Sequence, residues 1–344
     1  MDRVSAPQAL PDERKASELM RYRQLGASGL TVSVVGLGCN NFGSRAGLDQ
    51  TRAVVDAAID SGITLLDTAD VYGWRGGDPG ASEKLLAEAL KGRRDQVVLA
   101  TKFGSYMGPE AGPPDEARGS RRYIHRAVEA SLRRLQTDYI DLYQQHQPDR
   151  NTPVEETLAA LDDLVTQGKI RYAGSSNYAG WQIVEADWIA RTEHRARHIS
   201  AQNHYSLLQR DAENEIVPAC QRYGIGLLPY FPLANGLLTG KYHRNQPIPQ
   251  GTRLSNRAAD GTLFTDELFD RLEALEKYAA ERDQTLLTVA IAGLAAQPTV
   301  SSIIAGAMTP DQVRANATTA DWEPTPDDLD TLDAILPRGT TFTP

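Results

Sequence analysis

The chain has 344 residues, of which 41% are hydrophobic and 24% charged, a balance typical of a globular protein that buries a large core without disulfides. Its net charge of −9 without a basic stretch argues against a nucleic-acid partner, and its longest apolar runs are too short to span a membrane. The two cysteines give neither a disulfide framework nor a zinc-binding spacing, so we expect no metal and a cytoplasmic location.

The first 20 residues show no strand or helix pattern. Residues 1–20 lack the apolar core of a signal peptide, and we expect them to form a flexible leader before a single domain over 21–344. That domain opens with RYRQL and LTVS, two strand-like segments joined by GASG. The spacing predicts a small β-hairpin within 21–33.

Short apolar segments then alternate with amphipathic ones. The apolar segments predict strands at 32–38, 64–69, 97–103, 139–146, 170–177, 199–206, 225–232 and 300–306. Amphipathic patterns predict helices between them, among them 49–62, 81–92, 121–138 and 153–169. Because the strand segments are continuously apolar, they are typical of parallel strands covered by helices.

About eight such units predict an α/β fold, a (β/α)₈ barrel of the TIM type, with the hairpin closing its N-terminal end. The alternative is a doubly wound sheet, which would carry a Gly-rich fingerprint after its first strand, and VGLGCNNFG does not match that fingerprint. Two long loops, 104–120 and 234–261, follow strands, so in a barrel they would overhang the C-terminal face where active sites lie.

Four residues at or just beyond predicted strand ends indicate a chemistry. Asp67 and Tyr72 lie in LLDTADVY, Lys102 in VVLATKF and His146 in YIDLYQQH. A nearby ammonium favours the phenolate and lowers the pKa of a tyrosine, while an aspartate can hold the lysine charged and a histidine can orient a substrate oxygen. Each residue alone is open to a purely structural interpretation. Together on one rim they predict protonation of an oxygen as a carbonyl becomes an alcohol.

Reduction of a carbonyl also needs a hydride, which no side chain supplies, so a nicotinamide cofactor is implied. Ser175 and Asn177 follow the fifth strand and are placed to bond a carboxamide, and Tyr230 offers a ring for stacking. The GLLTGK segment at 236–241 offers small residues and a lysine for a pyrophosphate. Thr309 is predicted to cap a helix whose N-terminus favours an anion.

The chain resembles the aldo-keto reductase family over nearly its whole length, from Arg21 to Pro337. The segments that carry the resemblance are LGASGLTVSVVGLG, GITLLDTADVYG, VVLATKFG, IDLYQQHQPD, LVTQGKIRYAGSSNY, QNHYSLL, GLLTGKY and GAMTPDQVRAN. The resemblance implies a (β/α)₈ barrel and hydride transfer to a small-molecule aldehyde or ketone, with NADPH favoured and NADH possible. The long GLLTGK loop and the DQVRAN pattern are closer to bacterial and channel-subunit-like members than to the short mammalian reductases.

The resemblance also implies roles for individual residues. Asp67, Tyr72, Lys102 and His146 match the catalytic tetrad, with Tyr72 as the acid. The residues expected to contact the cofactor are Cys39, Asn40, Asp67, Ser175, Asn177, Gln202, Tyr230, Phe231, Pro232, Leu233, Gly236, Gly240, Lys241, Arg253, Gly306, Met308, Gln312 and Asn316. The residues expected to line the substrate pocket are Asn41, Phe42, Trp74, Phe103 and Tyr106, with core packing as the alternative for the aromatic ones.

The chain departs from the family pattern at three places. Met308 stands where many relatives carry Ser or Arg near the adenosine 2′-phosphate, and Ala315 replaces a common Glu before the final Asn. Asn40 and Asn41 follow the first strand, where they would either make the pocket more polar or only shape a turn.

Two other functions stay open at this stage. The channel-subunit branch implies a non-enzymatic nicotinamide-binding regulatory subunit, although such proteins can lack the histidine that is present here as His146. A polar pocket is also compatible with reduction of a deoxysugar intermediate in natural-product biosynthesis. The sequence indicates no oligomeric state.

Overall fold

The computed structural model of the chain describes residues 20–108, 112–255 and 264–341. Its centre is an eight-stranded parallel sheet in the order β10-β3-β4-β5-β6-β7-β8-β9. The strands are β3 (Val35–Gly38), β4 (Leu65–Asp67), β5 (Val98–Phe103), β6 (Ile140–Gln145), β7 (Ile170–Ser176), β8 (His198–Gln202), β9 (Gly226–Leu227) and β10 (Ile303–Gly306). Each lies within one of the eight strands predicted from the apolar segments, except that β8 begins one residue earlier.

The two ends of this sheet meet, so the sheet closes into a barrel. Parallel bridges join Leu227 to Val300 and Tyr230 to Ile304. The backbone N–H of Leu227 donates to Thr299 O at 2.8 Å, and the N–H of Ile304 donates to Pro229 O at 3.0 Å. The predicted barrel is therefore confirmed, with its shortest strand, β9, beside the closing seam.

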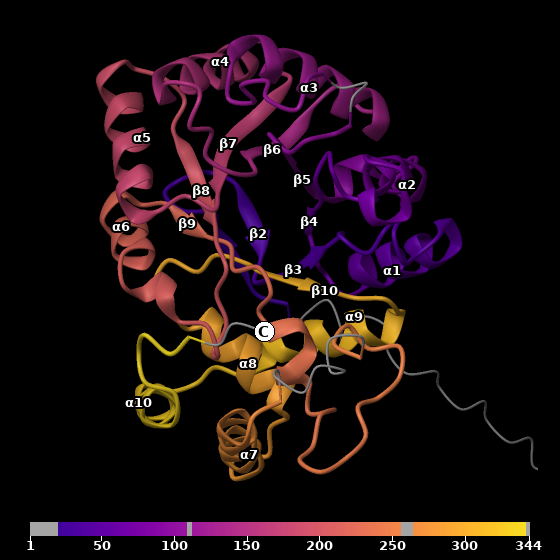
Figure 1. Cartoon of the computed structure of the whole chain (residues 1–344), viewed down its shortest axis with the longest axis vertical. Coiled ribbons are helices and arrows are strands. Elements are labelled where there is room, and N and C mark those ends of the chain that lie inside the picture. The colour runs from indigo at the N-terminus through magenta and orange to yellow at the C-terminus, as the bar shows by residue number, and fades with distance from the viewer. Residues whose placement is uncertain (1–19, 109–111, 256–263, 342–344) are drawn as a thin grey trace, which may run out of the picture.

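Helices surround this barrel (Figure 1). They are α1 (Leu48–Asp60), α2 (Ala81–Ala89), α3 (Arg121–Leu135), α4 (Val154–Thr166), α5 (Gly180–Thr192), α6 (Ile216–Tyr223), α7 (Asp266–Ala280), α8 (Leu286–Ala295), α9 (Pro310–Thr318) and α10 (Pro326–Ile335). Local signals set their starts. The Ser120 side chain accepts from Tyr123 N at the start of α3, and Thr309 caps α9 as predicted, with Pro310 in the first turn.

The predicted hairpin closes the N-terminal end of the barrel. β1 (Tyr22–Gln24) pairs antiparallel with β2 (Thr31–Ser33). Leu25 and Val32 are fully buried and pack against the innermost side chains of the barrel, Leu65, Ala100, Leu142, Leu228 and Ile304. Of the expected leader, residues 1–19 lie outside the described residues, and Met20 packs in the hydrophobic core.

The two long loops follow β5 and β9 as expected. Residues 104–108 and 112–120 connect β5 to α3, and the second loop contains a short 3₁₀ segment, η6 (Ala234–Thr239). Residues 109–111 and 256–261 of these predicted loops lie outside the described residues. None of the helices in the described ranges is long and apolar enough to cross a membrane.

Candidate active site

Strand alternation places three polar side chains in one layer at the C-terminal mouth of the barrel. Successive side chains of a strand point to opposite faces, so residues two apart share a face. Asp67, Lys102 and Gln144 each lie two residues after an inward-facing apolar residue of the barrel interior, namely Leu65, Ala100 and Leu142. The polar layer therefore rests directly on the closed apolar interior.

Asp67 and Lys102 form a buried ion pair within this layer. Lys102 Nζ lies 2.5 Å from Asp67 Oδ2, and the Lys102 and Asp67 side chains are 0% and 3% exposed. The same ammonium donates to Thr68 O at 2.8 Å and to Tyr72 Oη at 3.4 Å. The lysine thus joins the carboxylate to the phenol, as expected from the sequence for a tuned acid.

Two amide side chains complete the bonding of Asp67. Its Oδ1 accepts from Gln202 Nε2 at 2.9 Å and from Gln144 Nε2 at 3.1 Å. Gln202, expected to bond the cofactor, is 2% exposed, and its amide is turned toward this carboxylate. The Asp67 carboxylate therefore receives three donors from three other strands, which fixes its orientation.

Burial and charge act in opposite directions on the proton affinity of the phenol. Burial raises the pKa of Tyr72, and the positive charge of Lys102 only partly offsets this effect. We expected a net lowering of the tyrosine pKa, and the direction is the reverse because the effect of burial outweighs the charge of Lys102. Burial also lowers the pKa of Lys102, but Asp67 and Tyr72 outweigh it and leave the pKa raised. At neutral pH the site therefore holds a protonated phenol beside a charged ammonium.

His146 follows β6 and stands beside the phenol. Its ring lies 5.9 Å from the Tyr72 ring, centroid to centroid, at an interplanar angle of 79°. Burial, and then the charge of Lys102, lower the pKa of His146 to about 3, so the imidazole is neutral at physiological pH. Ser105 Oγ lies 3.2 Å from its Nδ1, so Nε2 is the ring nitrogen that has no contact with Ser105. A neutral imidazole suits hydrogen bonding to an oxygen rather than supplying the proton.

Tyr230 belongs to a second group of side chains near the mouth. Its hydroxyl donates to Asn177 Oδ1 at 2.8 Å, and Asn177 Nδ2 donates to His146 O at 2.9 Å. The Tyr230 ring stacks on His204 at 5.5 Å between centroids and 11° between planes. Asn177 itself adopts a left-handed backbone (φ 60°) just after β7. These contacts fix both the position and the plane of the Tyr230 ring.

The η6 segment brings a glycine against a lysine. Gly236 has φ 98°, and a Cβ there would lie 2.6 Å from Lys241 Nζ. Partial burial lowers the pKa of Lys241, and the positive charges of Arg253 and Arg45 lower it further. Arg253 also bonds Asn41 Oδ1 at 3.2 Å and lies 5.6 Å from the Phe231 ring centroid. Cations that repel one another in this way are typical of a place that favours an anion.

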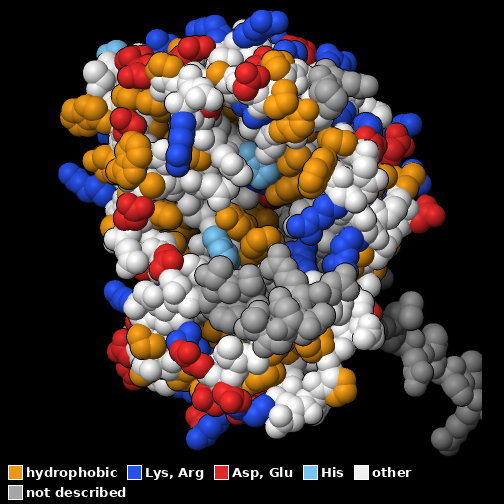
Figure 2. All heavy atoms as spheres, viewed as in Figure 1, with side chains coloured by type: hydrophobic (Ala, Val, Ile, Leu, Met, Phe, Trp, Pro, Cys, Tyr) orange, Lys and Arg blue, Asp and Glu red, His pale blue; other side chains and the backbone are white. Residues whose placement is uncertain are grey.

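The surface view is consistent with this arrangement. The face seen in Figure 2 is hollowed near its centre, where apolar and histidine side chains border the hollow. Lysine and arginine side chains gather on one side of the same hollow (Figure 2). The hollow therefore combines an apolar, imidazole-bearing part with a cationic part.

Comparison with known proteins decides the family. The model of the Aldo/keto reductase family matches residues 34–337, which include the whole barrel. The chain belongs to the aldo/keto reductase family. The resemblance noted in the sequence is thereby confirmed.

Similar members of the family carry several kinds of names. An "uncharacterized oxidoreductase YrpG" of Bacillus subtilis is 38% identical over 86% of this chain and 89% of its own length. A "probable voltage-gated potassium channel subunit beta" of rice is 34% identical over 92% of this chain and 97% of its own length. The "L-glyceraldehyde 3-phosphate reductase" of Escherichia coli K12 is 33% identical over 86% of both chains. Family and relatives together indicate that this aldo/keto reductase is an oxidoreductase.

Other expected cofactor residues of this aldo/keto reductase surround the start of α9. Met308 N donates to Gln312 Oε1 at 2.7 Å, and Met308 O accepts from Gln50 Nε2 at 2.5 Å. Gly306 faces the segment that follows β3, because a Cβ there would lie 3.9 Å from Asn40 Oδ1. Asn316 is buried. Two sets of expected cofactor residues remain. Ser175 is buried at the end of β7, and the residues next to η6 in the sequence are Phe231, Pro232, Leu233 and Gly240.

Three of the residues expected at the cofactor or the substrate pocket belong to the hydrophobic core. Cys39, Phe42 and Phe103 are all 0% exposed and pack in the main core cluster, so their assignment to the site stays a prediction. Phe103 follows the inward-facing Lys102 by one position, so it points to the helix layer and stacks on Tyr143 at 4.8 Å. Asn41 is 6% exposed and engaged with Arg253, on the cationic side of the mouth. Trp74 and Tyr106 are exposed, at 63% and 40%.

Four residues that contact the site were not predicted from the sequence. Gln144 had a signal, because it shares the inward face of its strand with Leu142. Ser105 and Arg45 lie in loops without a pattern that points to the site. His204 directly follows Gln202-Asn203 in the β8 segment, and its stacking on Tyr230 depends on a contact with the next strand segment that the sequence cannot show.

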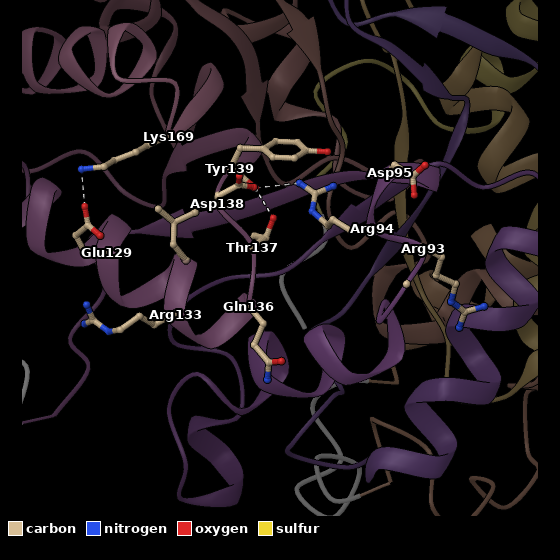
Figure 3. Close-up of a pocket in the computed structure, with 12 residues that line it drawn as sticks. Arg93, Arg94, Asp95, Glu129, Arg133, Gln136, Thr137, Asp138, Tyr139 and Lys169 are labelled. Carbon is tan, nitrogen blue, oxygen red and sulfur yellow. Dashed lines mark hydrogen bonds and ion pairs between the residues drawn. The ribbon is translucent and has the colours of Figure 1, made fainter.

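A separate shallow depression lies at the opposite, N-terminal end of the barrel, between the end of α3 and the starts of β5 and β6 (Figure 3). Three of its cations have anionic partners: Arg93 pairs with Asp56, Arg94 with Asp141, and Lys169 with Glu129. It contains none of the tetrad residues, so we assign the chemistry to the C-terminal mouth.

Proposed function

We propose that this protein reduces an aldehyde or a ketone to an alcohol with NADPH, with Tyr72 as the general acid. The contact that carries the proposal is the 3.4 Å approach of Lys102 Nζ to Tyr72 Oη while the same ammonium is held by Asp67. A partly buried phenol beside a fixed positive charge is suited to releasing its proton only when negative charge develops on a neighbouring oxygen.

The raised pKa of Tyr72 fits this role. The proton is present on the phenol throughout the neutral range, so the resting site is ready to donate. As the substrate oxygen gains charge, Tyr72 transfers its proton to that oxygen, and Lys102 stabilises the phenolate that remains. Neutral His146 presents a ring nitrogen to orient the carbonyl. Asp67 keeps Lys102 charged throughout.

The residues present fit a nicotinamide dinucleotide. The Tyr230 ring, fixed by Asn177 and His204, offers a plane for stacking. Gly236, which has a left-handed backbone and no Cβ next to Lys241 Nζ, offers a close approach, and Lys241, Arg253 and Arg45 offer positive charge for phosphates. When bound, the nicotinamide would supply the hydride. The cationic group is our reason to favour NADPH over NADH.

Tyr72→Phe tests the proposal. We expect kcat for a reactive aldehyde to fall by about 10²–10⁴-fold, because the general acid is lost, while the Kd for NADPH stays close to that of the wild type. The matched control is Tyr139→Phe, which removes a phenol from the opposite end of the barrel and should leave kcat unchanged. A Tyr72→Phe variant that keeps the wild-type rate would eliminate Tyr72 as the acid.

A second candidate is a regulatory subunit that binds the nicotinamide without turnover. The observation that favours it is the 34% identity to a protein named a probable channel subunit beta, over 97% of that protein. Tight NADPH binding without cofactor oxidation across aldehydes, ketones, quinones and keto-sugars would support this candidate. Reduction of a deoxysugar has weaker support, because Asn41, which we expected to make the substrate pocket polar, is bonded to Arg253.

A further inference from the structure

A buried carboxyl group that has no ion-pair partner among the described residues comes two positions before the tyrosine that we propose as the acid. This group belongs to Asp70, which is 2% exposed. Its Oδ1 is buried without a hydrogen-bond partner among the described residues, and its other contact is with the Val71 backbone N–H. A carboxylate in such a place would carry an uncompensated charge, which a protein normally avoids by pairing or by protonation.

The hydrogen-bond donors Thr101 and Arg134 bond to the neighbouring Glu83 and not to Asp70. The Glu83 side chain on α2 is 0% exposed, and its oxygens accept from Thr101 Oγ1 and Arg134 Nε, both at 2.6 Å. Lys102, the next cation that acts on Asp70, is held by Asp67 and Thr68 O. The negative charge of the cluster therefore resides on Glu83, and it opposes a second charge on Asp70.

Within the described ranges, the titratable groups around Asp70 add no positive charge that is free to pair with it. Glu83 faces it from α2, Arg134 and Tyr123 from α3, Lys102 from β5 and Tyr143 from β6. Tyr143 Oη is also buried and lacks a partner among the described residues. A buried neutral acid carries no charge that needs compensation, whereas a carboxylate here would need a second cation.

We propose that Asp70 holds a proton at neutral pH and, as a neutral acid, positions the segment that presents Tyr72. The backbone gives this role a short path. Asp70 N donates to Lys102 O at 3.1 Å, and Tyr72 O accepts from Gly80 N at 3.1 Å and from Ser82 N at 3.2 Å. A charge on Asp70 would draw water into this cluster and loosen the support behind Tyr72. The positioning role rests on the proposed function of Tyr72, but the protonation itself does not.

The first test measures unfolding by urea at pH 5, 6 and 7 for the wild type, Asp70→Asn and Asp187→Asn. Asp187 is the matched control, since it is 1% exposed but pairs with Arg191 and Arg197. The unfolded chain releases the Asp70 proton above the ordinary aspartate pKa of 3.8, whereas the folded protein keeps it, so folding becomes less favourable as pH rises. We expect the unfolding constant of the wild type, relative to Asp70→Asn, to rise about tenfold per pH unit.

Asp187→Asn should instead unfold more readily than the wild type at pH 7, because it breaks two ion pairs. If Asp70→Asn behaves like Asp187→Asn, or if its ratio to the wild type does not change with pH, Asp70 is ionised and the proposal is wrong. A protonated-carboxyl band in the infrared spectrum that disappears in Asp70→Asn would support it.

The second test separates positioning from folding. Asp70→Ala should lower kcat by about tenfold or more with little change in KM or in NADPH affinity, whereas Asp70→Asn should restore kcat because the amide is a neutral donor of the same shape. A folded Asp70→Asn variant without activity would overturn the positioning role. If the wild type itself reduces no carbonyl, the proposed function fails, and the urea series still decides whether Asp70 carries a proton.

Discussion

Replacement of Asp67 by Asn tests the buried ion pair on which the candidate site depends. The carboxylate accepts from Lys102 through one oxygen and from Gln144 and Gln202 through the other. Asparagine has one oxygen and one NH₂ group. In either orientation the NH₂ group faces a donor, so at least one buried donor is left without an acceptor.

The expected cost follows from burial. Lys102 is 0% exposed, and removing one partner of a buried pair typically costs about 3–5 kcal/mol. Without the Asp67 carboxylate, burial lowers the pKa of Lys102 in the folded variant below that of the unfolded chain, so the lysine can relieve part of this cost by releasing its proton. The variant should therefore lose most stability at low pH and recover some as pH rises.

Urea denaturation at several pH values, followed by circular dichroism, measures both effects. The double variant Asp67→Asn/Lys102→Met removes the stranded charge, and we expect it to unfold within about 2 kcal/mol of the wild type while remaining inactive. An Asp67→Asn variant that loses less than about 1 kcal/mol would show that the pair contributes little, and the proposed role of the buried pair would be refuted.

Three further outcomes are expected. Burial lowers the pKa of His198 to about 4, so folded His198 stays neutral while the unfolded chain takes up a proton below pH 6.5. Between pH 7 and pH 5 the free energy of unfolding should therefore fall by about 2 kcal/mol because of this group. Urea titrations of His198→Phe should lack that part of the loss. Gly236→Ala forces a Cβ into a left-handed backbone and should cost about 1–2 kcal/mol in thermal or urea unfolding, and a neutral result would contradict the strain at φ 98°. Lys241→Met should weaken NADPH binding by about 10–100-fold in fluorescence titrations, whereas Lys277→Met, on an exposed side of α7, should not; equal Kd values for the two variants would remove Lys241 from the cofactor site.

The sequence predicted the barrel because its evidence is repeated eight times. Apolar strands, amphipathic helices and their boundaries agree along the whole chain, and the structure shifts most predicted boundaries only by a few residues. The proximity of Asp67, Tyr72 and Lys102 was predictable because strand ends of a parallel barrel meet at one rim.

Side-chain direction and electrostatic balance were less predictable. The adjacent residues Lys102 and Phe103 both looked suitable for a rim site, but only one faces the interior, and the register that decides this is a property of the closed sheet. The direction in which the pKa of Tyr72 shifts depends on whether burial outweighs the charge of Lys102, and the spacing of residues does not show this balance. Likewise, Asp70 lacks an ion-pair partner because Arg134 pairs with Glu83 instead. Arg134 lies 64 positions after Asp70, so the sequence does not show which of the two acids it contacts.

The hairpin that closes the barrel floor has a consequence for folding during synthesis. Arg23 Nη1 donates to Val300 O at 2.8 Å across 277 positions of sequence, and Ser301 Oγ bonds Gln24 O at 3.2 Å. These bonds lie beside the β9–β10 seam, so the ring cannot be sealed until residues near 300 have left the ribosome. Contacts of such long range are formed slowly, and until then the strands at the two ends of the unclosed sheet, β3 and β9, keep an open edge. Residues near 300 therefore set when the barrel becomes a closed domain.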